Sequence, residues 1–248
     1  MKRSARQSAY LEAMGITQWV SNETPAEESM GSGSIESTEV VNTAVEETST
    51  QLNEPDPIDR SPVESLDWES LKKRVAACTQ CDLHKNRHQA VLGVGNLNAD
   101  WLIIGEAPGE QEDIQGEPFV GRAGLLLNNM LKAMGLEREQ VYIANVVKCR
   151  PPGNRDPHAD EIAACHAYLQ RQIDLIQPKI LLVSGRVAAQ SLLQTDAPVG
   201  RLRGKIHHYP GTEIPLVVTY HPAYLLRKPT EKAKAWQDLK LALSALPV

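Results

Sequence analysis

The chain has 248 residues, 42% of them hydrophobic, and this length can bury one full core with or without an additional tail. No apolar run approaches the roughly 18 residues of a membrane-spanning helix, and the N-terminus lacks the apolar stretch of a signal peptide. We therefore expect a cytoplasmic protein without membrane contact. Its four cysteines are then expected to be thiols or metal ligands rather than disulfides.

The net charge of −5 is unevenly distributed. Residues 1–64 carry twelve acidic and four basic side chains, which leaves a net charge of +3 on the rest of the chain. Residues 1–20 predict a short amphipathic segment that is interrupted near Gly15. Residues 21–64 are rich in Ser, Thr, Glu, Pro and Gly and predict a disordered acidic linker. The globular domain is expected over 65–248, and its mildly basic character suits a nucleic-acid binder or a neutral enzyme.

The expected elements of this domain alternate between helix and strand. In chain order they are a helix over 68–77, a strand over 101–104, a helix over 123–134, a strand over 141–147, a helix over 158–176 capped by Asp156, a strand over 179–184, a helix over 186–193, a short strand within 200–210, a strand over 215–219 and a helix over 231–245. This order predicts an α/β fold of three layers, α/β/α, around a four-stranded, mostly parallel sheet.

One loop of the expected sheet is rich in acid and glycine. Residues 105–124 read GEAPGEQEDIQGEPFVGRAG, with four acids within eight residues and with Phe119, the only phenylalanine of the chain. Open α/β folds bind ligands at the carboxyl ends of their strands. We expect this loop and the loops near residues 148 and 221 to meet at that edge, although a solvated surface loop with turn glycines is the alternative.

The four cysteines form a second constellation. Cys78 and Cys81 form a C-x-x-C pair, Cys149 follows the second expected strand, and Cys165 lies on the helix after it. Four thiolates can hold a tetrahedral zinc ion or a [4Fe-4S] cluster, and four unrelated buried thiols are the alternative. Zinc ribbons usually bring two C-x-x-C pairs, so the wide second spacing favours the cluster. Either group would be a structural link between the first helix of the domain and the second strand.

Several of these segments together resemble a known family. The loop 105–124, the segment NVVKCRPPGNRDP over 145–157, the motif HPAYLLR over 221–227 and the four-cysteine pattern are similar to family 4 uracil-DNA glycosylases. The resemblance covers about residues 66–248. It implies a four-stranded parallel sheet flanked by helices, a [4Fe-4S] cluster on the four cysteines, and hydrolysis of the bond between uracil and deoxyribose in DNA.

The resemblance also implies roles for three pocket residues. Phe119 matches the phenylalanine that stacks on uracil, and Asn145 matches the asparagine that reads the polar edge of the base. A fixed amide can accept from N3–H and donate to O4 of uracil, whereas cytosine presents the reverse pattern. His221 matches the histidine that hydrogen-bonds O2 as negative charge develops there. Without the resemblance, these residues would be read as a core phenylalanine and two turn residues.

The family's acidic positions are less clearly assigned. Glu106 and Ala107 match positions that line the pocket, and Glu112 matches an acidic position beside the base, where it could exclude the methyl group of thymine or place water. Related family 1 enzymes carry at the position of Ala107 an aspartate that orients the attacking water. A methyl group cannot do this, so the catalytic candidates are His221, Glu112 and Glu106, and the general base stays open.

DNA contacts follow from the same resemblance. Leu225 stands where related glycosylases insert a leucine into the space that the flipped base vacates, and Tyr224 is the neighbouring candidate. Four cations flank the expected site loops and could hold phosphates: Arg150, Arg155, Arg227 and Lys228. The short loop CRPPGNRDP lacks the Lys-Arg-Arg-Ile-His type motif of a covalent uracil-binding relative, so we expect turnover.

Two rival hypotheses remain. The first is a cluster-bearing DNA-binding or replication accessory protein without catalysis, because residues 10–19, YLEAMGITQW, faintly resemble the start of the bacterial DNA polymerase III psi subunit. Residues 1–20 would then dock on a component of the replication clamp loader. The second is a zinc-stapled nucleotide-binding enzyme, which a missing G-x-G-x-x-G motif disfavours. A monomer is the default expectation.

Overall fold

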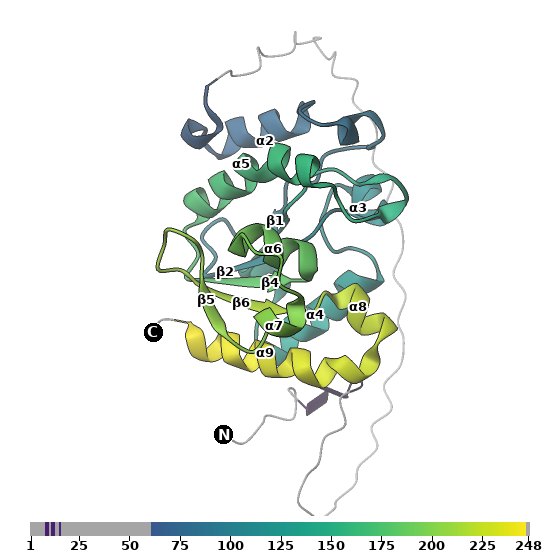
Figure 1. Ribbon diagram of the computed structural model, residues 1–248, viewed down its shortest axis with the longest axis vertical. Coiled ribbons are helices and arrows are strands. Elements are labelled where there is room, and N and C mark those ends of the chain that lie inside the picture. Colours follow the sequence, from purple (N-terminus) through teal and green to yellow (C-terminus); the bar gives the residue numbers. More distant parts are fainter. Residues whose placement is uncertain (1–7, 10, 13–14, 16–60, 247–248) are drawn as a thin grey trace, which may run out of the picture. The chain divides into compact units, whose positions relative to one another are not determined.

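A mixed sheet forms the centre of the domain (Figure 1). The computed structural model describes residues 8–9, 11–12, 15 and 61–246. Among these residues the sheet has six strands in the order β1-β3-β2-β4-β6-β5. The strands are β1 (Val94–Gly95), β2 (Trp101–Gly105), β3 (Tyr142–Asn145), β4 (Ile180–Ser184), β5 (Ile206–His208) and β6 (Pro215–Thr219). The four central strands run parallel, and β1 and β5 pair antiparallel at the two edges.

The four parallel strands are buried along their whole length. Strands covered on both faces read as continuous apolar runs, which is the pattern that the sequence shows at 101–104 and 215–219. Alternate residues of β2 enter different clusters: Leu102 and Ile104 face one side of the sheet, and Trp101 and Ile103 face the other. This confirms the expected α/β class and the four-stranded parallel core. Edge strand β5 falls within the short strand expected at 200–210, and β1 is an addition to the expected sheet.

Helices cover both faces of the sheet (Figure 1). One face carries α5 (Ala159–Ile176) and α6 (Arg186–Leu193), with α2 (Trp68–Ala76) packed on the outside of α5. The other face carries α4 (Arg122–Met134), α8 (Pro222–Arg227) and α9 (Lys232–Ala245). The shorter elements are α3 (Glu110–Gln115), α7 (Val199–Leu202) and the 3₁₀ turns η1 (Val63–Ser65), η2 (Asp82–Lys85), η3 (Arg138–Gln140), η4 (Pro152–Asn154) and η5 (Pro229–Glu231).

Two local expectations are wrong. Asp156 does not cap α5, because the helix begins at Ala159 and His158 is the cap residue, whose backbone N–H donates to the Glu161 carboxylate at 2.7 Å. The loop 105–124 also contains α3, which begins after Gly109. Within α3, Asp113 is fully buried and accepts backbone N–H groups of the segment before β1, so this loop acid serves packing rather than the site edge.

Little of the N-terminal segment lies within the described residues. Ser8, Ala9, Leu11 and Glu12 are helical, and Gly15 adopts a left-handed conformation with φ of 69°, at the expected interruption. Leu11 is 0% exposed and belongs to the cluster that contains α4 and α9. The predicted linker covers residues 21–64, and residues 21–60 of it lie outside the part of the chain that the structure describes. Within the described part of the chain, no helix has the length and apolarity to cross a membrane.

Candidate active site

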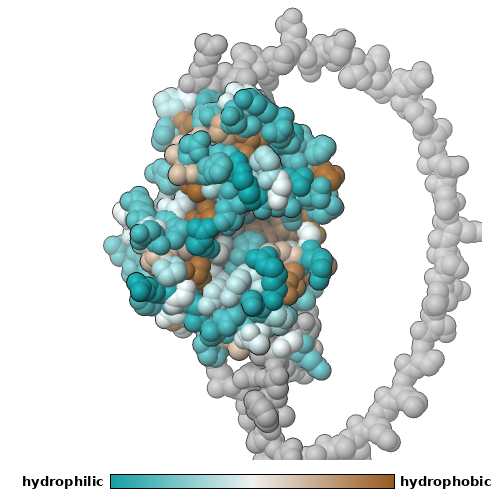
Figure 2. All heavy atoms as spheres, turned by 45° about the vertical axis from the view of Figure 1, so that its right-hand side comes forward, coloured by the Kyte–Doolittle hydropathy of each residue, from teal (hydrophilic) through white to brown (hydrophobic). Residues whose placement is uncertain are grey.

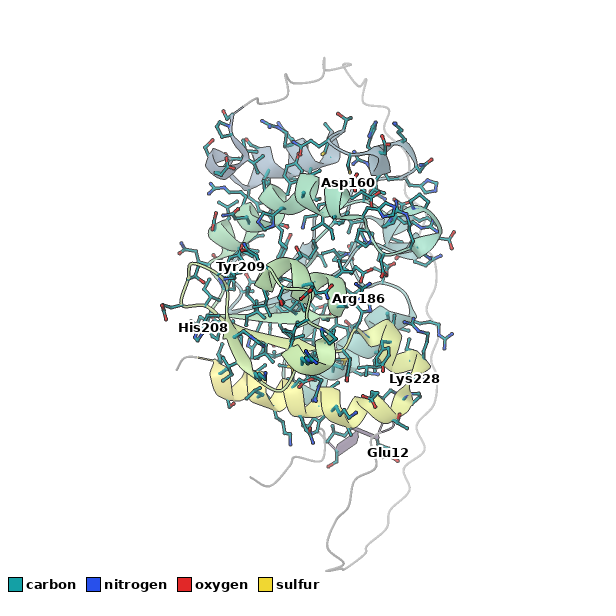
Figure 3. All side chains as sticks on the ribbon, viewed as in Figure 1. Glu12, Asp160, Arg186, His208, Tyr209 and Lys228 are labelled. Carbon is teal, nitrogen blue, oxygen red and sulfur yellow. The ribbon has the colours of Figure 1, made fainter. Side chains whose placement is uncertain are left out.

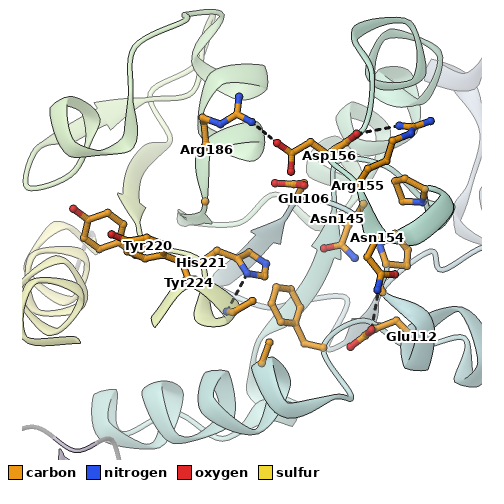
Figure 4. Close-up of a pocket in the computed structure, with 18 of the residues that line it drawn as sticks. Glu106, Glu112, Asn145, Asn154, Arg155, Asp156, Arg186, Tyr220, His221 and Tyr224 are labelled. Atoms are coloured by element: carbon orange, nitrogen blue, oxygen red, sulfur yellow. Dashed lines mark hydrogen bonds and ion pairs between the residues drawn. The ribbon is translucent and has the colours of Figure 1, made fainter. Parts of the chain in front are cut away.

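A cavity of about 750 Å³ opens at the carboxyl ends of the parallel strands (Figure 4). Residues that directly follow β2, β4 and β6 line it, together with the last residue of β3. Its volume is in the range of small-molecule sites. The face of the molecule drawn in Figure 2 is mainly hydrophilic, with hydrophobic side chains in small separate patches. The structure therefore brings the three expected loops to one place, as the rule for open α/β sheets predicts.

Asn145 and Phe119 form the closed end of this cavity. Asn145 is 2% exposed, and its side-chain oxygen has no hydrogen-bond partner within the described part of the protein. A buried acceptor without a partner costs free energy, so it is suited to a ligand that brings a donor. Gly105 makes room for both side chains: a Cβ there would lie 2.4 Å from the Asn145 oxygen and 2.7 Å from the Phe119 ring.

The backbone at Phe119 is held in a strained conformation. Its φ is 55°, which is unusual for a residue with a bulky side chain. Glu112 holds this segment, because its Oε1 accepts the backbone N–H groups of Val120 at 3.0 Å and Gly121 at 3.1 Å, while its Oε2 accepts that of Gly109 at 3.1 Å. Glu112 therefore lies beside the cavity as expected, and it fixes the position of the Phe119 ring.

His221 packs against this ring, and both rings line the cavity. The two rings are stacked with centroids 5.4 Å apart and an angle of 29° between their planes. The backbone N–H of Ala223 donates to Nδ1 of His221 at 3.2 Å, so Nδ1 is unprotonated and the proton of the neutral imidazole lies on Nε2. Burial, assisted by the positive charge of Arg227, lowers the pKa of His221 to about 4. At neutral pH the histidine is a neutral hydrogen-bond donor.

A carboxylate pair with an arginine lies on the opposite wall. Burial and, to a smaller extent, the adjacent negative charge of Asp156 together raise the pKa of Glu106 to about 7. Protonated Glu106 donates a hydrogen bond to Asp156. Arg186, at the start of α6, pairs with Asp156 on the other side (Figure 4). Ala107 lines the cavity beside Glu106.

The side chain of the expected wedge residue is buried in the structure. Leu225 is 1% exposed and packs in the core with α4 residues, so its side chain cannot reach DNA unless α8 moves. Tyr224, the neighbouring candidate, lines the cavity mouth and packs against Tyr220 with ring centroids 5.0 Å apart. The side chain available at this point of the structure is therefore that of Tyr224.

The four expected phosphate ligands differ in their availability. Arg155 donates two hydrogen bonds to Glu161, at 2.8 and 2.7 Å, and Arg150 lies 3.6 Å from Glu110. Arg227, which lines the cavity, and Lys228 are exposed at the end of α8; Figure 3 labels Lys228. These two cations are the better placed pair for contact with a polyanion.

Three residues near the cavity escape prediction from the sequence. Asp156 was expected to be a helix cap. Arg186 lies directly after β4, and the rule that open α/β sheets bind ligands at the carboxyl ends of their strands could have indicated this fourth loop. Lys148 is buried and donates through Nζ to the backbone oxygen of Asn145 at 2.7 Å and to Gln172. Burial lowers the pKa of Lys148 to about 8. No sequence pattern distinguishes this lysine from a surface one.

The four cysteines line one small cavity between α2, α5 and the loop after β3. Burial raises the pKa values of Cys81, Cys149 and Cys165. Two cationic residues donate to sulfur: Arg87 to Cys149 through Nη1 at 2.9 Å, and Lys148 to Cys165 through its backbone N–H at 3.3 Å. Among the described residues, no three His, Cys, Asp or Glu side chains meet in a group that would hold a single metal ion.

Comparison with known proteins agrees with this geometry. Residues 92–240 match the family described as the uracil DNA glycosylase superfamily, and the chain belongs to this superfamily. The type-4 uracil-DNA glycosylase of Archaeoglobus fulgidus is 42% identical, over 72% of this chain and 92% of the relative. That of Sulfurisphaera tokodaii is 46% identical over 69% and 81%, and that of Thermotoga maritima 42% over 71% and 93%. Within the superfamily, these relatives place the chain in the type-4 group.

Proposed function

We propose that the protein removes uracil from DNA by hydrolysing the bond between N1 of the base and C1′ of deoxyribose. The observation that carries this proposal is the unpartnered, buried oxygen of Asn145 at the closed end of a cavity walled by Phe119 and a neutral His221. The N3–H of uracil supplies the donor that this oxygen lacks, and the Asn145 amide nitrogen can donate to O4. The type-4 relatives support the same function.

The bond breaks with its electron pair remaining on uracil, and the sugar departs as an oxocarbenium-like cation. His221 then donates from Nε2 to O2, where negative charge grows. A neutral donor fixed before the reaction stabilises this charge without reorganisation. Water adds to C1′ and loses a proton, and Glu106 is the cavity carboxyl group available to accept it. Because both oxygens of Glu112 already accept backbone amides, we assign Glu112 to positioning Phe119.

The experiment uses an oligonucleotide with one uracil, followed by alkali, beside matched oligonucleotides with cytosine or thymine at that place. The protein should produce alkali-labile sites at uracil alone. Asn145→Ala should lower the single-turnover rate by roughly 10²-fold, because buried polar recognition is lost. Asn98→Ala, an exposed change before β2, is the matched control. If well-folded protein cleaved none of these oligonucleotides, the result would favour the rival hypothesis of a DNA-binding protein without catalytic activity.

We propose in addition that Cys78, Cys81, Cys149 and Cys165 bind a [4Fe-4S] cluster. The donor set fits, because four thiols line one cavity and four thiolates can hold a [4Fe-4S] cluster. Arg87 and Lys148 would offset the negative charge of such a cluster. When bound, the cluster would cross-link α2 to α5. The reaction itself takes place in the cavity lined by Asn145 and His221, where side chains carry it out.

Iron, sulfide and zinc analysis of the purified protein tests this assignment. We expect about four irons and visible absorbance. Cys149→Ser and Cys165→Ser should lose iron and lower Tm by at least about 5 °C, the shift that a loss of about 2 kcal/mol produces in a domain of this size. Zinc at one ion per chain without visible absorbance would contradict the cluster and favour the zinc alternative.

DNA contacts complete the proposal. Flipping uracil out of the duplex requires a side chain to fill the vacated stack, and Tyr224 at the cavity mouth is our candidate. Arg227 and Lys228 are the candidates for phosphate contact. The docking of residues 1–20 on a clamp-loader component stays a prediction, since most of that segment lies outside the described residues.

A further inference from the structure

We infer that Asp156 and Arg186 are positioning residues that act in opposite directions on Glu106, the acceptor of the water proton, and thereby set the pH at which the enzyme becomes active. The inference rests on the proposed function, because it concerns the same hydrolysis. It gives roles to two residues that the comparison with type-4 relatives does not assign. It also addresses the water-activating group that Ala107 leaves open.

The geometry consists of three charged side chains in a row along one cavity wall (Figure 4). Glu106 is half-buried directly after β2 and hydrogen-bonds Asp156, which lies in the loop before α5. Arg186 reaches Asp156 from the start of α6. The three residues thus come from three different strand-end loops.

The other titratable groups that line the cavity do not shift the pKa of Glu106. Arg155 pairs with Glu161 and also donates to the backbone oxygen of Asp156. Glu112 is held by backbone amides, and His221 is neutral. Arg227 lies at the mouth on α8. The charges that act on Glu106 are therefore those of Asp156 and Arg186.

The sign of each effect follows from charge. The negative charge of Asp156 and its hydrogen bond to the protonated form keep the proton on Glu106, whereas the positive charge of Arg186 favours the ionised form. Glu106 accepts the proton of the attacking water only when ionised. In the wild type, activity should rise with pH through about 7, the pKa of Glu106.

Water screens this pair in the free protein, because the Arg186 and Asp156 side chains are 54% and 61% exposed. DNA bound across the cavity mouth would exclude water and strengthen both interactions.

The chemical step balances as follows. The C1′–N1 bond breaks with its electrons on uracil, the water oxygen bonds to C1′, and one proton of this water moves to Glu106. The uracil anion later takes a proton from solvent.

The test is the pH dependence of single-turnover uracil excision at saturating enzyme, from pH 5 to 9. Asp156→Asn should move the rising limb to lower pH by about 0.5–1 unit, and Arg186→Gln should move it to higher pH by a similar amount. Glu106→Gln should abolish the limb and lower the rate at pH 8 by roughly 10²-fold. Asp100→Asn and Lys179→Gln, which remove an ion pair of 3.2 Å at the opposite edge of the sheet, should leave the profile unchanged.

Opposite shifts distinguish this inference from a structural role, because loss of folding would lower the rate at every pH and move both variants together. Profiles that superimpose on the wild type, or a shift of both variants in one direction, would overturn it. A wild-type profile in Glu106→Gln would also overturn it, while the uracil proposal stands. Failure of the wild type to excise uracil at any pH would instead overturn the proposed function itself.

Discussion

Replacing His221 by alanine should lower the single-turnover rate of uracil excision by roughly 10²- to 10³-fold, the cost of one donor to a developing oxyanion. The Nε2 proton of the neutral ring is the donor that the structure directs toward the cavity, since Nδ1 is occupied by the Ala223 N–H. Because the pKa of His221 is about 4, the ring should stay neutral from pH 5 upward and add no limb to the profile there.

His208→Ala is the matched control, because His208 is exposed on edge strand β5, away from the cavity lining. It should retain the wild-type rate. Thermal unfolding of both variants separates loss of the donor from loss of folding. A His221→Ala variant with unchanged Tm and a rate within about threefold of wild type would contradict the role of this donor.

Replacing Gly105 by alanine should be nearly as damaging, although the change adds one methyl group. The new Cβ would lie 2.4 Å from the Asn145 oxygen and 2.7 Å from the Phe119 ring, a separation that real contacts do not permit. Both side chains must shift, and misplacement by about 1 Å can lower a rate by roughly 10²-fold. We expect the single-turnover rate to fall by that factor.

Gly200→Ala is the control for this change. Gly200 lies in α7, and a Cβ there meets nothing within 4 Å. Its rate and Tm should match those of the wild type. If Gly105→Ala retained full activity, the closed end of the cavity could not be the place where the base binds, and the assignment of Asn145 and Phe119 would fail with it.

The sequence predicts the parallel core well because those strands are buried on both faces. Continuous apolar runs such as 101–104 are a strong signal, and β6 begins and ends at the expected residues. Edge strand β1 is two residues long and lies outside the core, so periodicity has nothing to detect there, whereas β5 falls within the short strand expected at 200–210. The cap of α5 differs from the expected one for another reason: the Glu161 carboxylate accepts the backbone N–H of His158, so His158 and not Asp156 is the cap residue.

Part of the candidate site could likewise be predicted from the sequence, and part could not. The resemblance indicated Phe119, Asn145 and His221, and the structure brings all three to one cavity. The resemblance also indicated Leu225, but it does not reveal that α8 turns this side chain into the core. Contacts between distant loops, such as that of Arg186 with Asp156, depend on strand order and therefore emerge only in three dimensions.

The measurement that tests the central claim most directly is a crystal structure of the protein with uracil and a DNA oligonucleotide that carries an abasic site. The account predicts the uracil ring stacked on Phe119, its N3 and O4 within hydrogen-bond distance of the Asn145 amide, and its O2 facing Nε2 of His221. Uracil bound at another place, or in this cavity with the Asn145 oxygen still unpartnered, would contradict it.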